Sequence, residues 1–67
     1  MTKYQRLKIA AAILGVSIKD LCSEADISMT GLKGVADGHI TSERVSSFID
    51  AKIEESEKIF QQQKQSA

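Results

Sequence analysis

Few side chains in this sequence could carry covalent chemistry or bind a metal ion. The chain has one cysteine, Cys22, and one histidine, His39. A structural zinc site needs about four such ligands, and nucleophilic catalysis needs a nucleophile, a base and an orienting group at matching spacings. Neither pattern is present, so we expect no metal, no cofactor and no enzymatic activity. We expect Cys22 to pack in the core, where two predicted helices need a small residue.

Hydroxyl and carboxyl groups that can cap helices are more informative. Ser17 and Asp20 form a capping-box pattern, and Ser28 can cap a second helix. Asp26 lies between the two helices, where the chain must turn, and aspartate tolerates a left-handed conformation. The two helices are predicted over residues 18–25 and 29–36. This is the outline of a helix-turn-helix, whose second helix has an exposed start that is free to enter a DNA major groove.

Two further helices are predicted on either side of this pair. The first covers residues 3–14 and ends at Gly15, which suits a left-handed C-cap. The last covers residues 42–60, with Thr41 or Ser42 as its cap. Its apolar residues recur at intervals of three and four, and they are Val45, Phe48, Ile49, Ile53, Ile59 and Phe60.

Length and composition predict one small all-α domain. The chain has 67 residues, of which 42% are hydrophobic, and it has no proline. We place the domain at residues 1–60 and expect the polar tail, residues 61–67, to fray. Because a chain this short buries only about 60% of its unfolded surface, we expect dimerisation to add stability.

Charge is balanced in total but uneven along the chain. Nine basic and nine acidic residues give a net charge of zero, whereas a nucleic-acid-binding domain is usually basic. Basic residues dominate up to Asp20, and acidic residues gather in the second half. A basic face near the predicted helix-turn-helix and an acidic far end are therefore compatible with overall neutrality.

The cysteine content and the length of the apolar runs indicate in which cellular compartment the protein is expected. A single cysteine allows no intramolecular disulfide, which favours a reducing interior. No apolar run reaches the roughly 20 residues that a membrane span requires. We therefore expect a cytoplasmic protein that does not contact a membrane.

Several short motifs share one ungapped register. They are Gly15-Val16-Ser17, Leu21-Cys22, Ile27-Ser28, the apolar pair Leu32 and Val35, and Gly38. In this register the stretch from Leu7 to Ile53 resembles the Cro and repressor family of small phage and bacterial helix-turn-helix regulators. The resemblance implies a compact lambda-repressor-like domain of four to five helices. Its helix-turn-helix would cover residues 17–38, followed by an extended C-terminal helix.

The sequence differs from the family pattern at informative positions. An arginine and a glutamate that commonly pair in the family are replaced by Ala11 and Ala36, so no buried charge is left without its partner. A glutamine that holds a phosphate is Ile18 here. The second helix carries Gly31 and Gly34, and Gly34 falls where relatives place a base-reading side chain. Either this helix approaches the DNA backbone closely, or base reading is confined to its first turn.

The resemblance also implies which residues contact DNA. Met29, Thr30 and Lys33 are expected to reach base edges, where Thr30 can meet a thymine methyl and Lys33 a guanine acceptor or a phosphate. Residues expected to hold phosphates surround them, and they are Lys19, Ser28, His39, Thr41 and Arg44. The alternatives are a solvated polar helix face and, for Met29, an adaptable contact with a protein partner.

The end of the last helix predicts a partner. Ile53, Ile59 and Phe60 extend beyond a core of three short helices, so we expect them to contact a second copy of the chain across a two-fold axis. The alternative is a bend near Ser56 that folds the end back. The resemblance implies a sequence-specific repressor of phage or prophage type that binds double-stranded DNA as a dimer. The competing hypothesis is a protein-binding module, such as an antirepressor or a regulatory subunit.

Overall fold

Hydrogen bonds at the helix ends decide where the first three helices start and stop. The computed structural model describes the chain over residues 1–66, and the side chains of residues 1–62. The four helices are α1 (Lys3–Leu14), α2 (Ile18–Ala25), α3 (Met29–Ala36) and α4 (Glu43–Ser66). The predicted all-α class and the predicted bounds of α1, α2 and α3 are confirmed.

The caps of α2 and α3 are those that the sequence predicts. Ser17 Oγ accepts a hydrogen bond from the Asp20 N–H at 3.0 Å, and the Asp20 carboxylate accepts one from the Ser17 N–H at 3.1 Å. Asp26 ends α2 in a left-handed conformation with φ of 54°. Ser28 Oγ then accepts from the Gly31 N–H at 3.0 Å. The turn between α2 and α3 is therefore held at both ends by local bonds.

The start of α1 also has a capping box, which the sequence analysis overlooked. Thr2 Oγ1 accepts a hydrogen bond from the Gln5 N–H at 3.1 Å, and the Gln5 side chain accepts one from the Thr2 N–H at 2.9 Å. The other end of α1 is as expected, because Gly15 adopts a left-handed conformation with φ of 75°. Each of the three short helices thus begins at a side-chain cap.

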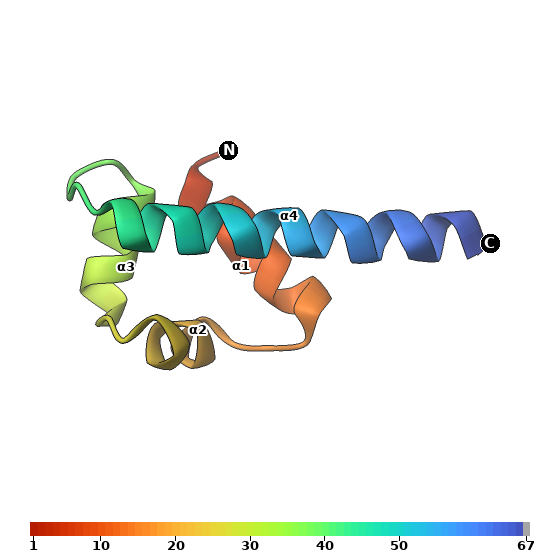
Figure 1. The fold of residues 1–67 in the computed structure, drawn as a ribbon, viewed down its shortest axis with the longest axis horizontal. Coiled ribbons are helices and arrows are strands. Elements are labelled where there is room, and N and C mark those ends of the chain that lie inside the picture. Colours follow the sequence, from red (N-terminus) through yellow and green to blue (C-terminus); the bar gives the residue numbers. More distant parts are fainter. Residues whose placement is uncertain (67) are drawn as a thin grey trace.

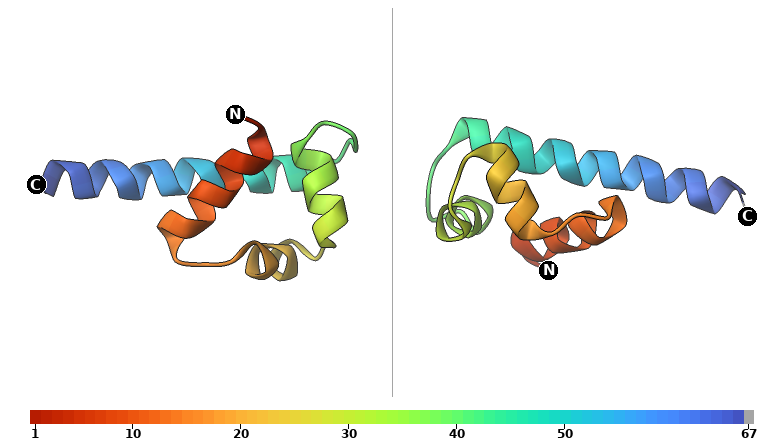
Figure 2. Two further views of the ribbon diagram at one scale, coloured as in Figure 1. Left: turned by 180° about the vertical axis from the view of Figure 1, so that it is seen from behind. Right: turned by 90° about the horizontal axis from the view of Figure 1, so that it is seen from below.

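The other helices pack against the long helix α4. The C-terminal end of α4 extends beyond the other helices (Figure 1). The other three helices lie on one side of α4 when the molecule is seen from below, and α1 crosses it when the molecule is seen from behind (Figure 2). The whole is 40 Å long but only 20 by 18 Å in cross-section.

The core lies between α4 and the three short helices. Its largest fully buried side chains come from all four helices, and they are Leu7, Leu21, Leu32, Val45 and Ile49. Cys22 is buried among them, as predicted. Ala11 and Ala36 are buried too. The positions that carry a charged pair in the resembling family are thus part of an apolar core here.

The structure extends and corrects the predictions for α4. Ser42 is its cap, because Ser42 Oγ accepts from the Val45 N–H at 3.4 Å. The helix continues to Ser66, beyond the end predicted at residue 60, and residue 67 of the predicted tail lies outside the described residues. The helix is unbroken at Ser56, so the predicted alternative of a bend there is wrong.

Ile53 is a second correction. It was expected to be left over for a partner, but only 7% of it is exposed and it belongs to the core. The reason is that α1 packs extensively on α4 and covers it to this level. Spacing along α4 predicts which face is apolar but not how far a neighbouring helix reaches.

Charged side chains join α4 to the short helices at the surface. Lys3 Nζ lies 2.6 Å from an Asp50 oxygen, and Lys52 Nζ lies 3.1 Å from a Glu24 oxygen. Such exposed pairs contribute at most about 1 kcal/mol each. None of the helices within residues 1–66 combines the length and the apolar character that crossing a membrane requires.

Candidate nucleic-acid interface

The exposed side of α3 is the candidate site. Leu32, Val35 and Ala36 are buried on one side of this helix. Residues three and four apart share a helix face, so Thr30, Lys33 and Gly34 occupy the opposite side. The three residues predicted to reach bases are all exposed, including Met29, of which 49% is accessible. Nothing in the packing of the domain uses the side chain of Thr30 or Met29 as a core residue.

Lys33 has a partner that the sequence analysis missed. Its Nζ lies 5.7 Å from the centre of the Tyr4 ring, and Lys8 Nζ lies 5.8 Å from the same ring. Both distances allow a cation–π attraction, which is worth about 0.5–1 kcal/mol at an exposed site. The aromatic ring of α1 therefore holds two ammonium groups together and extends the positive charge beside α3 onto α1.

Three of the residues predicted near phosphates or bases meet at a shallow hollow between α2 and α3. Lys19, Ser28 and Met29 all line it. Ser28 Oγ already accepts a hydrogen bond from the Gly31 N–H, but its own O–H remains a donor. The structure thus brings together an ammonium group, a hydroxyl donor and a thioether at the start of α3.

The remaining predicted phosphate contacts lie around the loop between α3 and α4. His39 and Thr41 are exposed there. Arg44 has a structural contact, because its guanidinium donates to the Ala25 carbonyl at 2.6 Å and so ties the start of α4 to the end of α2. A guanidinium carries five N–H groups, so this contact leaves others for a second acceptor.

Neighbours within the chain account for both glycines of α3. A Cβ on Gly31 would lie 2.8 Å from the Ile27 side chain, and one on Gly34 would lie 2.5 Å from Cδ1 of Ile40. Real Cβ atoms essentially never come so close to another heavy atom. Gly34 is therefore covered by Ile40. Close approach of α3 to the DNA backbone and base reading confined to its first turn both stay predictions.

The one cysteine is poorly suited to reactivity. Burial raises the pKa of the Cys22 thiol, so the thiol stays protonated at neutral pH, and the thiolate is the reactive form. Over the part of the chain that the structure describes, no three His, Cys, Asp or Glu side chains cluster in a way that could hold a metal ion.

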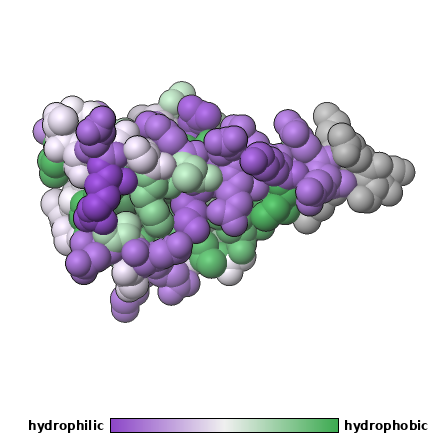
Figure 3. All heavy atoms as spheres, viewed as in Figure 1, coloured by the Kyte–Doolittle hydropathy of each residue, from purple (hydrophilic) through white to green (hydrophobic). Residues whose placement is uncertain are grey.

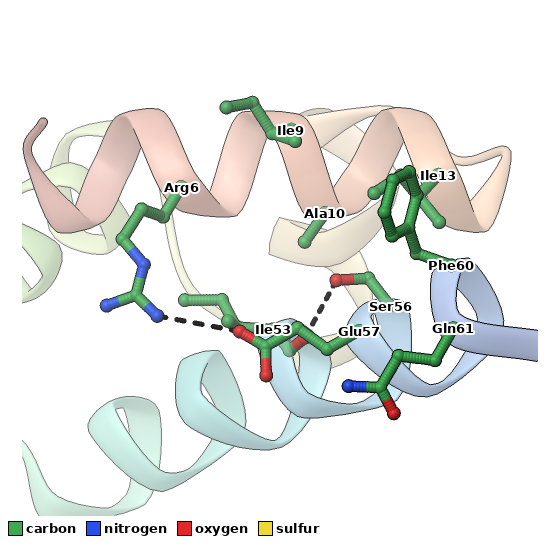
Figure 4. Close-up of a pocket in the computed structure, with 9 residues that line it drawn as sticks. All are labelled: Arg6, Ile9, Ala10, Ile13, Ile53, Ser56, Glu57, Phe60 and Gln61. Atoms are coloured by element: carbon green, nitrogen blue, oxygen red, sulfur yellow. Dashed lines mark hydrogen bonds and ion pairs between the residues drawn. The ribbon is translucent and has the colours of Figure 1, made fainter. Parts of the chain in front are cut away.

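A groove between α1 and α4 is the second surface of interest. It has a volume of about 320 Å³ and lies between Ile9 and Ile13 of α1 and Phe60 of α4. Phe60 is 55% exposed and lies beside Ile13, while Arg6 reaches toward Glu57 at the other end (Figure 4). That charged pair is loose, with 3.7 Å between the guanidinium nitrogen and the carboxylate oxygen.

The surface around α4 is mixed in character. Hydrophilic residues cover most of the face that α4 presents in Figure 3, and hydrophobic residues emerge below it toward its C-terminal half. Of the predicted dimer contacts, Phe60 is exposed and Ile59 is half-buried. Both remain accessible, unlike Ile53, and Phe60 lines the far end of the groove.

Comparison of the chain with protein-family models, with curated proteins and with solved structures finds no match. The resemblance to Cro and repressor proteins therefore depends on the residues quoted above. Function has to be argued from the surfaces themselves, above all from the exposed side of α3.

Proposed function

We propose that this protein is a sequence-specific DNA-binding regulator, with α2 and α3 as its helix-turn-helix and α3 as the recognition helix. The observation that carries the proposal is the exposed side of α3. It presents Thr30 and Lys33 on a capped helix whose opposite side is locked into the core. A helix held in this way can enter a major groove without rearranging the domain.

The side chains divide into two roles in this proposal. Thr30, Lys33 and Met29 read bases, because they combine a hydroxyl, an ammonium group and an apolar tip suited to major-groove edges. Lys19, Ser28, His39, Thr41 and Arg44 hold phosphates and fix the orientation of α3. The pairing of Lys8 with Tyr4 adds a further positive charge beside α3.

The proposal includes a dimer that acts by occupying an operator. Ile59 and Phe60 contact a second copy across a two-fold axis, with Ile9 at the edge of the same groove. Arg6 and Glu57 carry opposite charges at that groove, so a two-fold axis can pair each with its counterpart on the other copy. Two α3 helices would then enter successive major grooves, about 34 Å apart, and exclude polymerase.

The test is selection of bound fragments from a random duplex library, followed by mobility shifts of the selected duplex over a range of salt concentrations. We expect retention of a defined sequence, with affinity falling steeply as salt rises, because binding to phosphates releases counterions. Lys33→Ala should weaken binding while the fold survives. Lys58→Ala is the matched control, since Lys58 is exposed on α4 and pairs there with Glu54.

Two results would contradict the proposal. One is no selected sequence at any salt concentration. The other is a duplex whose affinity falls by the same factor in Lys33→Ala and Lys58→Ala, which would mean that binding does not involve the exposed side of α3. A selected duplex that binds Lys33→Ala as tightly as the wild type would remove Lys33 from the site.

A second candidate function is protein binding, as an antirepressor or a regulatory subunit. The zero net charge favours it, because DNA-binding domains are usually basic. Association through the groove between α1 and α4 would be apolar and would change little with salt. The salt dependence of binding therefore separates the two functions.

A further inference from the structure

The loop after α3 folds back onto the middle of that helix. The N–H groups of His39 and Ile40 both donate to the Gly34 carbonyl, at 2.8 and 3.1 Å. Gly38 makes this reversal possible by adopting a left-handed conformation with φ of 83°. Ile40 is thereby fixed to α3, although it belongs to the loop.

The side chain of Ile40 occupies the space where a side chain of residue 34 would begin. A Cβ built on Gly34 would lie 2.5 Å from Cδ1 and 2.9 Å from Cγ1 of Ile40. Any residue with a side chain at position 34 would displace Ile40. Gly34 and Ile40 therefore depend on each other. The loop residue Ile40 supplies an apolar side chain at the place where α3 has none.

This arrangement puts an apolar group on the side of α3 that faces away from the core. Gly34 follows Thr30 by four residues, so these two positions share a face of the helix. Ile40 remains 46% exposed although it packs against Gly34. It lines a hollow with Thr41, Ser42 and Glu43, so its exposed part is an apolar spot among polar residues.

We propose that Ile40 is a base-contacting residue that recognises the 5-methyl group of a thymine. This inference rests on the proposed function, because it requires α3 to lie in a major groove. The thymine methyl is the apolar feature that base pairs present in that groove. Isoleucine offers no hydrogen bond, so its contribution to sequence preference is contact with this methyl group.

The test uses the duplex selected by the wild-type protein, with each thymine replaced in turn by deoxyuridine, which lacks only the methyl group. At one position in each half-site we expect the wild-type affinity to fall about fourfold, the effect of exposing one buried methyl group. Ile40→Ala should bind the unmodified duplex less tightly and should be insensitive to deoxyuridine at that same position. Any methyl read by Thr30 keeps its effect in this variant.

Val16→Ala is the matched control. Val16 is an aliphatic residue of comparable exposure, 38%, and it lies in the turn between α1 and α2, away from α3 and from the groove between α1 and α4. This variant should keep the full wild-type response to deoxyuridine. Thermal melting of both variants shows whether the fold is retained, which we expect because both side chains are exposed.

The outcomes separate this inference from the function on which it rests. If the wild type selects no duplex, both are overturned. If it selects a duplex but no thymine methyl matters, or if Ile40→Ala weakens the thymine and deoxyuridine duplexes equally, the DNA-binding function stands. In that case Ile40 is only a cover for Gly34, and the inference is overturned.

Discussion

The exposed side of α3 and the distal half of α4, from Glu57 onward, are both accessible, but the domain supports them differently. α3 is short, is capped by Ser28, and lies between α2 and α4. The distal half of α4 is supported by α1 along one side and is tied to it by the loose Arg6–Glu57 pair at 3.7 Å. The α3 surface is therefore held in place by neighbouring helices, whereas the distal half of α4 continues past the end of α1.

The two surfaces also differ in the side chains that they present. The side of α3 presents hydroxyl and ammonium groups, with Lys33 held beside the Tyr4 ring. The distal half of α4 combines the exposed ring of Phe60 with the carboxylate of Glu57. Negative charge there repels phosphates, while the aromatic ring suits a protein surface. The two surfaces thus lie toward opposite ends of α4 and differ in the chemistry they present.

The largest expected effect is on stability and comes from the buried side of α3. Leu32 of α3 is fully buried, and Leu32→Ala should cost about 2–5 kcal/mol of unfolding free energy because it leaves a cavity. A chain of 67 residues has roughly 3–10 kcal/mol in total. The variant should therefore lose a large share of its unfolding free energy, as measured by urea titration followed by circular dichroism.

Phe60→Ala is the counterpart at the other end. At low protein concentration it should cost less than about 1 kcal/mol, because the ring is half exposed in the monomer. Equal losses from Leu32→Ala and Phe60→Ala would mean that the distal half of α4 is as integral to the fold as α3 is. The contrast between the two regions would then be wrong.

The second expected effect is on self-association. Replacing Ile59 and Phe60 together by aspartate should weaken the proposed dimer at least tenfold, about 1.4 kcal/mol, because four unpaired charges would enter an apolar contact. Sedimentation equilibrium at micromolar concentrations measures this directly. Lys58→Ala, on the same stretch of α4, should leave the dimer intact. A double variant that remains dimeric would exclude this end of α4 as the interface.

The contrast between the two regions also explains what could be predicted from sequence. Helix ends in the first part of the chain depend on local bonds, so Ser17, Ser28 and Gly15 predicted them correctly. The Thr2–Gln5 cap follows the same rule and could have been found in the same way. Each of these caps is formed by residues within a few positions of one another, so the sequence alone is enough to predict it.

Properties that depend on distant segments could not be predicted in this way. The burial of Ile53 depends on how far α1 reaches along α4. Ile40 belongs to no periodic pattern, and only the folded loop brings it onto Gly34. The predicted end of α4 at residue 60 is too early, because polar residues alone do not end a helix and glutamine and lysine are good helix formers.

A smaller effect should distinguish two serines. Ser17→Ala removes the cap of α2 and should cost about 1 kcal/mol. Ser56 Oγ donates to the Ile53 carbonyl within α4 at 2.7 Å. Such a bond within a helix adds little, so Ser56→Ala should change stability by less than about 0.5 kcal/mol. Thermal melting of the two variants side by side tests the difference, and a larger loss from Ser56→Ala would contradict it.

The smallest expected effect concerns Lys52, which ties the near half of α4 to α2. Its hydrogen bond to Glu24 raises the pKa of the Lys52 ammonium above its usual value, burial partly opposes this, and the charges of Glu24 and Glu55 add to it. A lysine with a raised folded-state pKa contributes its stability in full below the unfolded pKa of about 10.4. That contribution disappears as the pH rises through the folded-state pKa.

Lys52→Met keeps the length of the side chain but not its charge, so the stability difference between wild type and variant isolates the ion pair. Because the Glu24 and Glu55 side chains are more than half exposed, we expect a difference below about 1 kcal/mol at neutral pH. It should shrink as the pH rises above about 10.5, toward and through the raised pKa. Urea titrations at neutral pH and at successively higher pH measure it. A difference that stays constant would show that Lys52 stabilises the fold by packing against the Phe48 ring of its own helix, 5.5 Å away, rather than by its ion pair with α2.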